Sequence, residues 1–153
     1  MKYGFTIPGS GPLTAPPIMS EIVRRGEELG FDFLVCPDHI IFPRDVSSPY
    51  PYNEEGVHPG TLTGECLDQL TMLAFIAGQT TTIGLGTSVM IVPHRNPLVA
   101  AKSIATLDVL SGGRVILGLG VGWLREEFEV LGLPPFDERG AVTDEYLRAW
   151  IEL

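Results

Sequence analysis

Four apolar, strand-like runs, each followed by a segment of helical periodicity, most constrain the fold of this chain. No hairpin signal separates one run from the next, so the units imply parallel strands joined by right-handed crossovers. The sequence therefore predicts an α/β fold of the (βα) TIM-barrel type. The expected strands span residues 2–7, 31–36, 82–92 and 114–119, and the expected helices span about 15–29, 66–79, 96–110 and 140–153. The apolar residues expected to pack are Ile18, Ile22, Val23 and Leu29 on the first helix, and those available for packing on the third are Leu98, Ala101, Ile104, Ala105 and Leu107.

The number of these units sets the size of the predicted barrel. A closed (βα)8 barrel needs eight strands and typically about 250 residues, whereas this chain has 153 residues and about four units. We expect residues 1–153 to form a single domain equivalent to half a barrel, which ends inside a helical pattern. Its first and fourth strands would have unpaired edges, and these favour a homo-oligomer or another association through the exposed edges.

The fourth expected strand ends in alternate glycines. Residues 114–119 form a short apolar run between glycines, which is typical of a buried strand. Gly118, Gly120 and Gly122 remove side chains from one face of the chain, so that a ligand can lie close to the backbone. The pattern lacks the third glycine spacing and the later acidic residue of a dinucleotide-binding fingerprint.

The charge and hydropathy patterns exclude several kinds of partner. The formal net charge is -9 at pH 7, whereas a nucleic-acid surface is basic and an anionic membrane attracts basic segments. No apolar run approaches the roughly 18 residues that span a bilayer, and the start MKYGFTIPGSGP does not resemble a signal peptide. We therefore expect a cytoplasmic protein with no nucleic-acid or membrane partner. In that reducing compartment Cys36 and Cys66 are expected to be buried free thiols.

Residues 40–65 form a long polar loop after the second expected strand. Loops of this length are uncommon in a compact domain and are most often functional lids or binding loops, or else disordered. We expect an active-site loop, with a disordered segment as the alternative. Its prolines and tyrosines are Pro43, Pro49, Pro51, Pro59, Tyr50 and Tyr52.

Polar residues follow the second and third expected strands. Asp38 and His39 follow the second strand, and His94, Arg95 and Asn96 follow the third. In a barrel of this type the chemistry lies at the carboxyl ends of the strands. Imidazole exchanges protons near neutral pH, although a histidine that caps a turn and an ordinary loop aspartate remain open. His94, Arg95 and Asn96 are candidates for phosphate or substrate contact, and Asn96 is also expected to cap the next helix.

A metal-dependent hydrolase is the alternative from a different functional class. It would use His39, His58 and His94 together with Asp38. Because these histidines lack the close spacing of metal ligands, we predict no metal site.

Four segments in order, spread over the whole chain, resemble one family. They are KYGFTIPG, FDFLVCPDH, TTIGLGTSVMIVPHRNPLVAAKSIATLDVLSGGR and RVILGLGVGWLREEFEVLGLPPFDERGAVTDEYL. The chain resembles the bacterial luciferase-like flavin and deazaflavin oxidoreductases, most closely the branch that uses the deazaflavin coenzyme F-420. The resemblance implies that residues 1–153 are the N-terminal half of a luciferase-like (βα)8 barrel.

The resemblance also implies roles for residues at the second and third strands. His39 corresponds to the catalytic histidine near the reactive edge of the coenzyme ring in deazaflavin-dependent relatives. Asp38 corresponds to a residue that contacts the polar edge of the ring. Ser88 and Val89 correspond to a non-proline cis peptide in a bulge that backs the ring.

The end of the fourth strand corresponds to the part of the family's site that lies against the cofactor, formed here by Gly120, Val121, Gly122 and Trp123. Several deazaflavin enzymes carry a glutamate where this chain has Trp123. Glu126 and Glu127 lie one helical turn further, and each is expected on a solvated helix face rather than in a catalytic role.

The function that the resemblance implies is an oxidoreductase that transfers hydride between F-420 and a small organic substrate, with His39 exchanging the proton. An FMN-dependent monooxygenase of the same family is the first alternative. The second is a non-catalytic half-barrel that associates with itself or with a partner. In this family many of the contacts that bind the cofactor phosphate come from loops in the second half of the barrel.

Overall fold

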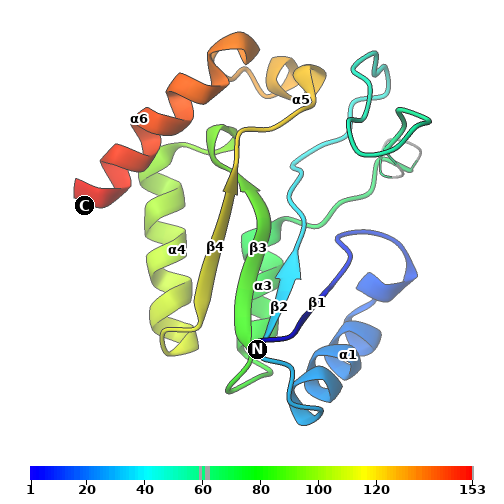
Figure 1. The fold of residues 1–153 in the computed structure, drawn as a ribbon, viewed down its shortest axis with the longest axis vertical. Helices are drawn as coiled ribbons and strands as arrows, with labels where there is room; N and C mark the ends of the chain where they lie inside the picture. The colour runs from blue at the N-terminus through cyan, green and yellow to red at the C-terminus, as the bar shows by residue number, and fades with distance from the viewer. Residues whose placement is uncertain (59, 61–62, 153) are drawn as a thin grey trace.

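The computed structural model describes residues 1–58, 60 and 63–152 and contains a sheet of four parallel strands in the order β1-β2-β3-β4 (Figure 1). Each strand pairs in parallel with the next along the chain. This confirms the predicted α/β fold with parallel strands. The bounds are β1 Gly4–Thr6, β2 Phe33–Cys36, β3 Gly84–Ile91 and β4 Val115–Gly120.

Helices connect the strands, as the alternating pattern predicted. Figure 1 shows α3 behind the strands, between α1 and α4, while α5 and α6 follow β4. Pro59 and residues 61 and 62 of the expected 40–65 loop, and residue 153 of the expected last helix, lie outside the described residues. The bounds are α1 Pro16–Glu28, α3 Gln69–Ala77, α4 Pro97–Ser111, α5 Arg125–Val130 and α6 Arg139–Glu152, with 3-10 turns η1 Pro12–Thr14, η2 Val92–His94 and η3 Phe136–Glu138.

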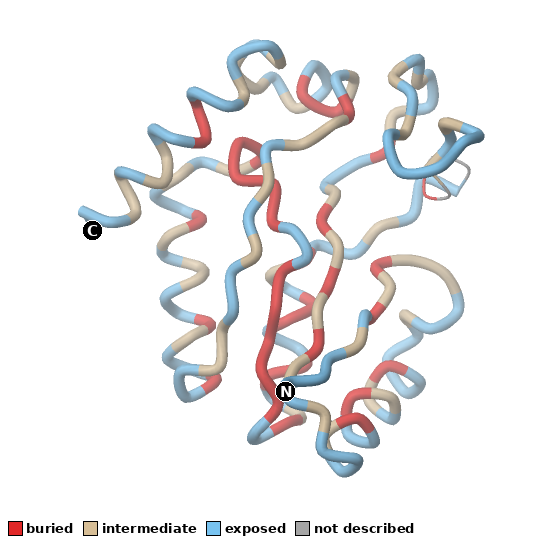
Figure 2. The backbone as a smooth tube through the Cα atoms, in the orientation of Figure 1, coloured by how far each residue is buried: buried red, intermediate tan, exposed pale blue. Residues whose placement is uncertain are grey.

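The main core fills the space between the sheet and the helices. Leu34 of β2, Leu85 of β3, and Leu73 and Ile76 of α3 are completely buried in it. Figure 2 shows that β3 is buried over most of its length, apart from a short exposed stretch. The core thus supports the middle strands of the sheet, whose carboxyl ends carry the predicted site.

The buried stripe of α1 differs from the predicted one. Met19, Val23 and Gly26 are buried. Of the residues predicted to pack, Val23 is buried and Ile22 packs partly buried against the core, whereas Ile18 and Leu29 are 43% and 61% exposed. Positions 19, 23 and 26 follow the i, i+4, i+7 spacing of a single helix face, and Leu29 lies beyond the last helical residue. The sequence pattern therefore located the helix and part of the face that packs.

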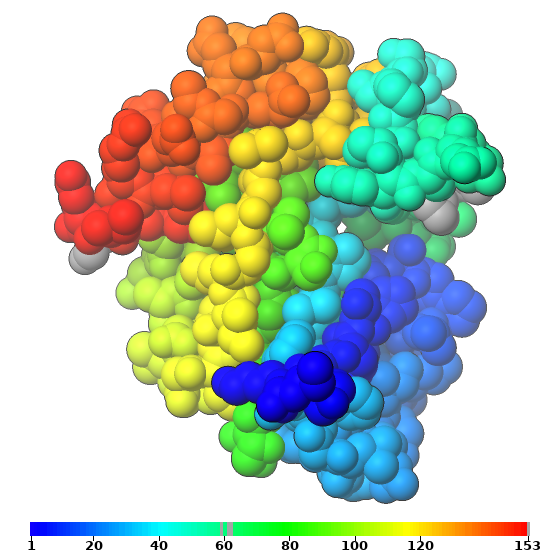
Figure 3. Space-filling model, viewed as in Figure 1, coloured from blue at the N-terminus to red at the C-terminus, as the bar shows by residue number. Residues whose placement is uncertain are grey.

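Strand β4 is not the buried strand that its apolar sequence predicted. Ile116 and Leu117 are 49% and 39% exposed, and Figure 3 shows β4 uncovered in front of the other strands. The reason is its position at the edge of the sheet, where β3 is its only neighbouring strand among the residues that the structure describes. Such an exposed apolar edge is the kind that favours association. Association through this edge stays a prediction.

Helix α4 begins and ends as predicted. The Asn96 side chain caps it by accepting hydrogen bonds from the Leu98 and Val99 amides at 3.0 and 3.3 Å. Gly112 ends it in the left-handed conformation with φ of 74°. Of the residues expected to be available for packing, Leu107 is buried, Ala101 and Ile104 are partly buried, and Leu98 and Ala105 are exposed. Ala100, which was not among them, is also buried.

Both cysteines are free, as predicted. Cys36 is buried in the core, and this burial raises the pKa of its thiol to about 12. Cys66 was also expected to be buried, but it is only half-buried, because it lies in the loop that precedes α3. In the part of the chain that the structure describes, we find no helix with the length and apolar character needed to cross a membrane.

Glu27, near the end of α1, binds the segment that leads into β3. One carboxylate oxygen accepts hydrogen bonds from the backbone amides of Thr81, Thr82 and Ile83 at 2.8, 2.6 and 3.0 Å. Burial alone would raise the pKa of Glu27, but these hydrogen bonds lower it to about 2. The carboxylate is therefore charged in the folded protein at neutral pH.

Glu27→Gln is expected to lower the free energy of unfolding by about 1.5–3 kcal/mol at pH 7, because a hydrogen bond to a charged group contributes about that much. Since the folded-state pKa lies below the usual value of 4.5 for a glutamate, the stabilisation is present above pH 4.5 and is lost as the pH falls toward 2. Urea unfolding at several pH values measures both effects. Glu28→Gln is the control, because its ion pair with Arg25 is exposed. If the difference in free energy of unfolding between Glu27→Gln and the unmodified chain did not become smaller in acid, this explanation would be contradicted.

Candidate functional site

The candidate site is a cavity at the carboxyl ends of β2, β3 and β4, with a volume of about 210 Å³. Gly120, the one predicted site residue outside its lining, lies under Val89: a Cβ atom at Gly120 would be 2.5 Å from Val89 Cγ2. The roles of these residues stay predictions. The predicted residues that line the cavity are Asp38, His39, Ser88, Val89, Val121, Gly122 and Trp123, and the further lining residues are Pro37, Tyr50, Tyr52, His58 and Ile91.

Ser88 and Val89 form the exposed stretch of the otherwise buried β3 (Figure 2). The register between β3 and β4 shifts between Thr87 and Met90, and the Ser88–Val89 peptide bond is cis, as the resemblance implies. The Thr87 hydroxyl donates to the Gly118 carbonyl at 2.7 Å and accepts from its amide at 2.9 Å. The bulge is thereby tied to β4, and Val89 lies in the wall of the cavity.

The segment after β4 completes an apolar wall, which we define as Val89, Val121, Gly122 and Trp123. Val89 and Val121 are 43% and 39% exposed. Gly122 has φ of 85°, and a Cβ atom there would lie 2.8 Å from Phe128 Cε2 and 2.9 Å from Ile91 Cγ2. Glycine is therefore required for both conformation and space at this position. The apolar wall is a partly exposed surface at the place where the glycine pattern predicted a ligand.

Asp38 is held by Arg95 beneath the cavity. Its carboxylate accepts two hydrogen bonds from the Arg95 guanidinium at 2.7 and 2.9 Å, and a third from the Ile91 amide at 2.8 Å. Arg95 also donates to Asp68 at 2.8 Å. Burial alone would lower the pKa of Arg95, but the hydrogen bonds and charges of the two aspartates raise it. Arg95 is thus engaged by aspartates, and Asp38 fixes the backbone at the end of β3.

His39 pairs with Glu127, which is completely buried. Nδ1 of His39 lies 2.7 Å from one Glu127 oxygen. The other oxygen accepts hydrogen bonds from the amides of Ile40 and Ile41 at 2.7 and 3.1 Å. The expectation that Glu127 lies on a solvated helix face was therefore wrong, because α5 turns this side chain toward the residues that follow β2.

Glu126 also departs from the solvated position expected for it. One of its oxygens accepts hydrogen bonds from the Ser47 amide, the Ser47 hydroxyl and the Ser48 amide at 2.8, 2.7 and 2.9 Å. Burial alone would raise the pKa of Glu126, but these hydrogen bonds lower it to about 2. The two adjacent glutamates of α5 therefore anchor the first part of the 40–65 loop.

Aromatic side chains of the loop pack over the cavity. The Tyr50 ring meets the Trp123 ring edge to face, with centroids 5.2 Å apart. The His58 ring stacks on Phe42 at 5.0 Å and lies 5.3 Å from the His39 ring. The loop therefore lies beside the cavity, and its role as an active-site loop and its action as a lid stay predictions.

Glu127 is the main residue that the sequence interpretation missed. Leu124, Glu127 and Phe128 follow the i, i+3, i+4 spacing of one helix face, and all three are buried. This spacing could have indicated a buried carboxylate. Tyr50, Tyr52 and His58 were noted in the sequence, but no local pattern indicated that the long loop would place them beside His39.

His94 lies below the His39–Glu127 pair. Its Nδ1 atom is 3.7 Å from a Glu127 oxygen, its side chain is buried, and burial lowers its pKa. Among the described residues, we find no group of three or more His, Cys, Asp or Glu residues that could hold a metal ion. The arrangement of His39, His58, His94 and Asp38 therefore gives no support to a metal-dependent hydrolase.

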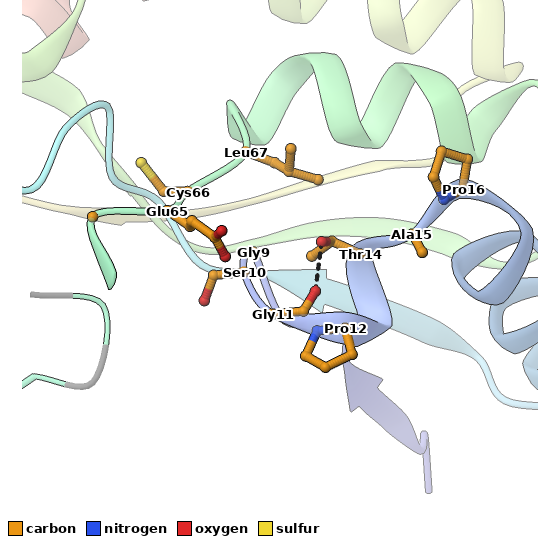
Figure 4. A pocket seen from close by; sticks show the side chains of 11 residues that line it. Gly9, Ser10, Gly11, Pro12, Thr14, Ala15, Pro16, Glu65, Cys66 and Leu67 are labelled. Atoms are coloured by element: carbon orange, nitrogen blue, oxygen red, sulfur yellow. Dashed lines mark hydrogen bonds between the residues drawn. The ribbon is translucent and has the colours of Figure 1, made fainter. Parts of the chain in front are cut away.

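A second, larger hollow of about 790 Å³ lies between the turn after β1 and the segment before α3. Figure 4 shows the residue 9–16 turn facing the residue 64–67 segment, with the Thr14 hydroxyl donating to the Gly11 carbonyl at 2.7 Å. Glu65 and Cys66 are the titratable side chains in its lining. The candidate site is the smaller cavity, because that is where histidine, carboxylate and the apolar wall converge.

The structure is part of a (βα) barrel, because it has a parallel sheet whose strands alternate with helices. Its cavity lies at the carboxyl ends of the strands, where the active sites of such barrels are found. The sequence matches the family described as luciferase-like monooxygenase over residues 5–153. The chain belongs to this family.

Individual relatives agree with that membership. The F420-dependent glucose-6-phosphate dehydrogenase of Amycolatopsis mediterranei is 34% identical over 156 residues, which cover 100% of this chain and 41% of the dehydrogenase. An uncharacterized protein of Mycobacterium tuberculosis is 33% identical over 149 residues, or 97% of this chain and 51% of that protein.

A solved structure agrees as well. The monooxygenase RslO1 from Streptomyces bottropensis superimposes with a TM-score of 0.69 at 28% identity, covering 98% of this chain and 42% of that one. The chain thus spans about half, or less, of the length of the proteins it matches.

Proposed function

We propose that this chain carries part of a deazaflavin-dependent oxidoreductase that transfers hydride between F-420 and a small organic substrate. The observation that carries the proposal is the cavity in which His39 lies beside the apolar wall. The choice of coenzyme is supported by the 34% and 33% identity to two proteins named F420-dependent glucose-6-phosphate dehydrogenase.

The cavity residues fit a planar heteroaromatic ring. Val89 and Val121 offer apolar surface for a ring face, and Gly122 allows close approach of the backbone. Ser88, His39 and Asp38 supply polar atoms at the same cavity. These residues would hold the ring system, whose chemistry when bound is the acceptance and donation of hydride.

Side chains of the protein would exchange the substrate proton and exclude water from the cavity. Imidazole is the side chain that most often serves as a general acid or base, so His39 would accept or donate the substrate proton. Tyr50 and Trp123 would cover the cavity and limit the access of water. No lysine or arginine is among the described residues that line the cavity, so the coenzyme phosphate would be bound by groups outside it.

An FMN-dependent monooxygenase is the second candidate. It is favoured by the structural similarity to a monooxygenase at 28% identity, with a TM-score of 0.69. The same apolar wall would seat the isoalloxazine ring of FMN. The two candidates differ in the coenzyme that the chain selects.

Titration of the chain with F-420 and, separately, with FMN tests the proposal. We expect F-420 to bind more tightly and to quench the fluorescence of Trp123, which lines the cavity. Val89→Asp is expected to weaken this binding, because the ring would then have to desolvate a charge. Val99→Asp makes the same change at an exposed site on α4 and is the control.

Other outcomes of the titration favour other functions. Tighter binding of FMN would support the monooxygenase. Binding of neither coenzyme would overturn the proposal and favour a non-catalytic half-barrel. Equal loss of binding in Val89→Asp and Val99→Asp would place the coenzyme elsewhere on the chain.

A further inference from the structure

Glu127 is a buried carboxylate whose two oxygens bind different groups. Oε2 lies 2.7 Å from Nδ1 of His39, and Oε1 accepts from the amides of Ile40 and Ile41 at 2.7 and 3.1 Å. A buried charge is tolerated only when it is paired and hydrogen-bonded. The side chain is completely buried, so its three partners are the reason that it can remain ionised there.

We propose that Glu127 is a positioning residue, which orients the His39 ring, fixes its tautomer with the proton on Nδ1, and so leaves Nε2 as the proton acceptor at the cavity. The proposal rests on the proposed function, in which His39 exchanges the substrate proton. It extends that function by assigning a role to a residue that does not line the cavity.

The tautomer follows from the donors and acceptors. Burial alone would raise the pKa of Glu127, but the hydrogen bond with His39 and the neighbouring histidines lower it, so the carboxylate is charged at neutral pH. An ionised carboxylate only accepts hydrogen bonds. Nδ1 of His39 must therefore donate, and in the neutral ring Nε2 then carries the lone pair.

The other titratable groups around His39 and Glu127 do not take the place of Glu127 as the partner of His39 Nδ1. On η2, His94 lies 3.7 Å from Oε1, and burial lowers its pKa. On the loop, the His58 ring lies 5.3 Å from His39, and its pKa is lowered first by burial and then by His39. Cys66, on the segment before α3, has a pKa raised first by burial and then by Glu127. Asp38 and Arg95 form their own ion pair.

If Glu127 is replaced by glutamine, the tautomer of His39 is expected to invert. Glutamine has one oxygen, which the Ile40 and Ile41 amides require as their acceptor. Its NH2 group would then face Nδ1 of His39 and donate to it, so the ring proton would move to Nε2. Glu127→Gln thus preserves the shape of the side chain while removing the proton acceptor from the cavity.

The test is nitrogen NMR of the histidine rings in the chain without coenzyme, recorded at rising pH until the histidine signals stop changing. The chain has three histidines, so single His→Gln variants assign the signals. We expect a protonated Nδ1 and an unprotonated Nε2 for His39 in the unmodified chain, and the reverse in Glu127→Gln. Glu126→Gln, the matched control on the adjacent residue, is expected to leave the tautomer of His39 unchanged.

Several results would overturn the inference. One is a protonated Nε2 of His39 in the unmodified chain, a measurement that does not depend on the folding of any variant. The others are an unchanged His39 tautomer in a folded Glu127→Gln chain, or an equal change of tautomer in Glu126→Gln. With coenzyme bound, turnover of Glu127→Gln is expected to fall on the order of 10²–10⁴-fold at unchanged coenzyme affinity. If the tautomers behave as expected but neither coenzyme binds, the proposed function fails while the positioning of His39 by Glu127 stands.

Discussion

Replacement of Asp38 by asparagine is expected to lower the free energy of unfolding by about 3–5 kcal/mol, because breaking a buried ion pair leaves the partner charge uncompensated. Asp38 is 4% exposed, and it accepts two hydrogen bonds from Arg95 and one from the Ile91 amide. Asparagine keeps the shape of the side chain but can present only one oxygen. Urea unfolding at neutral pH measures the loss.

Asp68→Asn is the matched control for this prediction. It removes the same charge from the same arginine, but the Asp68 side chain is 47% exposed. Asp68 also caps α3 by accepting from the Thr71 amide, and asparagine caps a helix about as well as aspartate. The expected cost is below about 1 kcal/mol, as for exposed ion pairs. Equal costs for the two variants would show that burial of Asp38 does not determine the contribution of this ion pair.

His39→Gln is expected to reduce turnover on the order of 10²–10⁴-fold, which is the usual contribution of general acid–base catalysis. Glutamine cannot exchange a proton near neutral pH, whereas the apolar wall that would seat the ring is unchanged. Coenzyme affinity is therefore expected to stay nearly the same. The measurement is the rate of absorbance change of the bound coenzyme in the presence of an organic substrate.

His58→Gln provides the comparison for this prediction, because His58 lines the same cavity. We expect a smaller loss of turnover, since the structure pairs Glu127 with His39 at 2.7 Å. A loss as large as that of His39→Gln would assign the proton exchange to His58. Loss of coenzyme binding in His39→Gln would show that His39 acts in binding rather than in proton exchange.

The sequence predicted the parallel sheet and most of the candidate site because both depend on local patterns. The order of strands and helices followed from periodicity, and the cap at Asn96 followed from a residue type with a known local role. The three strand ends that line the cavity followed from the topology of parallel strands together with the family resemblance. The cis bond between Ser88 and Val89 followed from the resemblance alone.

The predictions that failed depended on contacts between distant parts of the chain. Glu127 is buried because its partners, His39 and the Ile40 and Ile41 amides, lie more than 80 residues earlier. Ile116 in β4 is exposed because β4 is an edge strand, with no strand on its outer side in the described part of the chain. Residue type and spacing identify which side chains can be buried, but tertiary contacts decide which of them are.

The most direct test of the proposed function is a crystal structure of the chain with F-420 bound. We expect the deazaflavin ring to lie against Val89 and Val121, with His39 at its edge and Glu127 still paired with Nδ1. A ring bound outside this cavity, or crystals that hold no coenzyme at concentrations that saturate related enzymes, would contradict the assignment of the apolar wall as the coenzyme site.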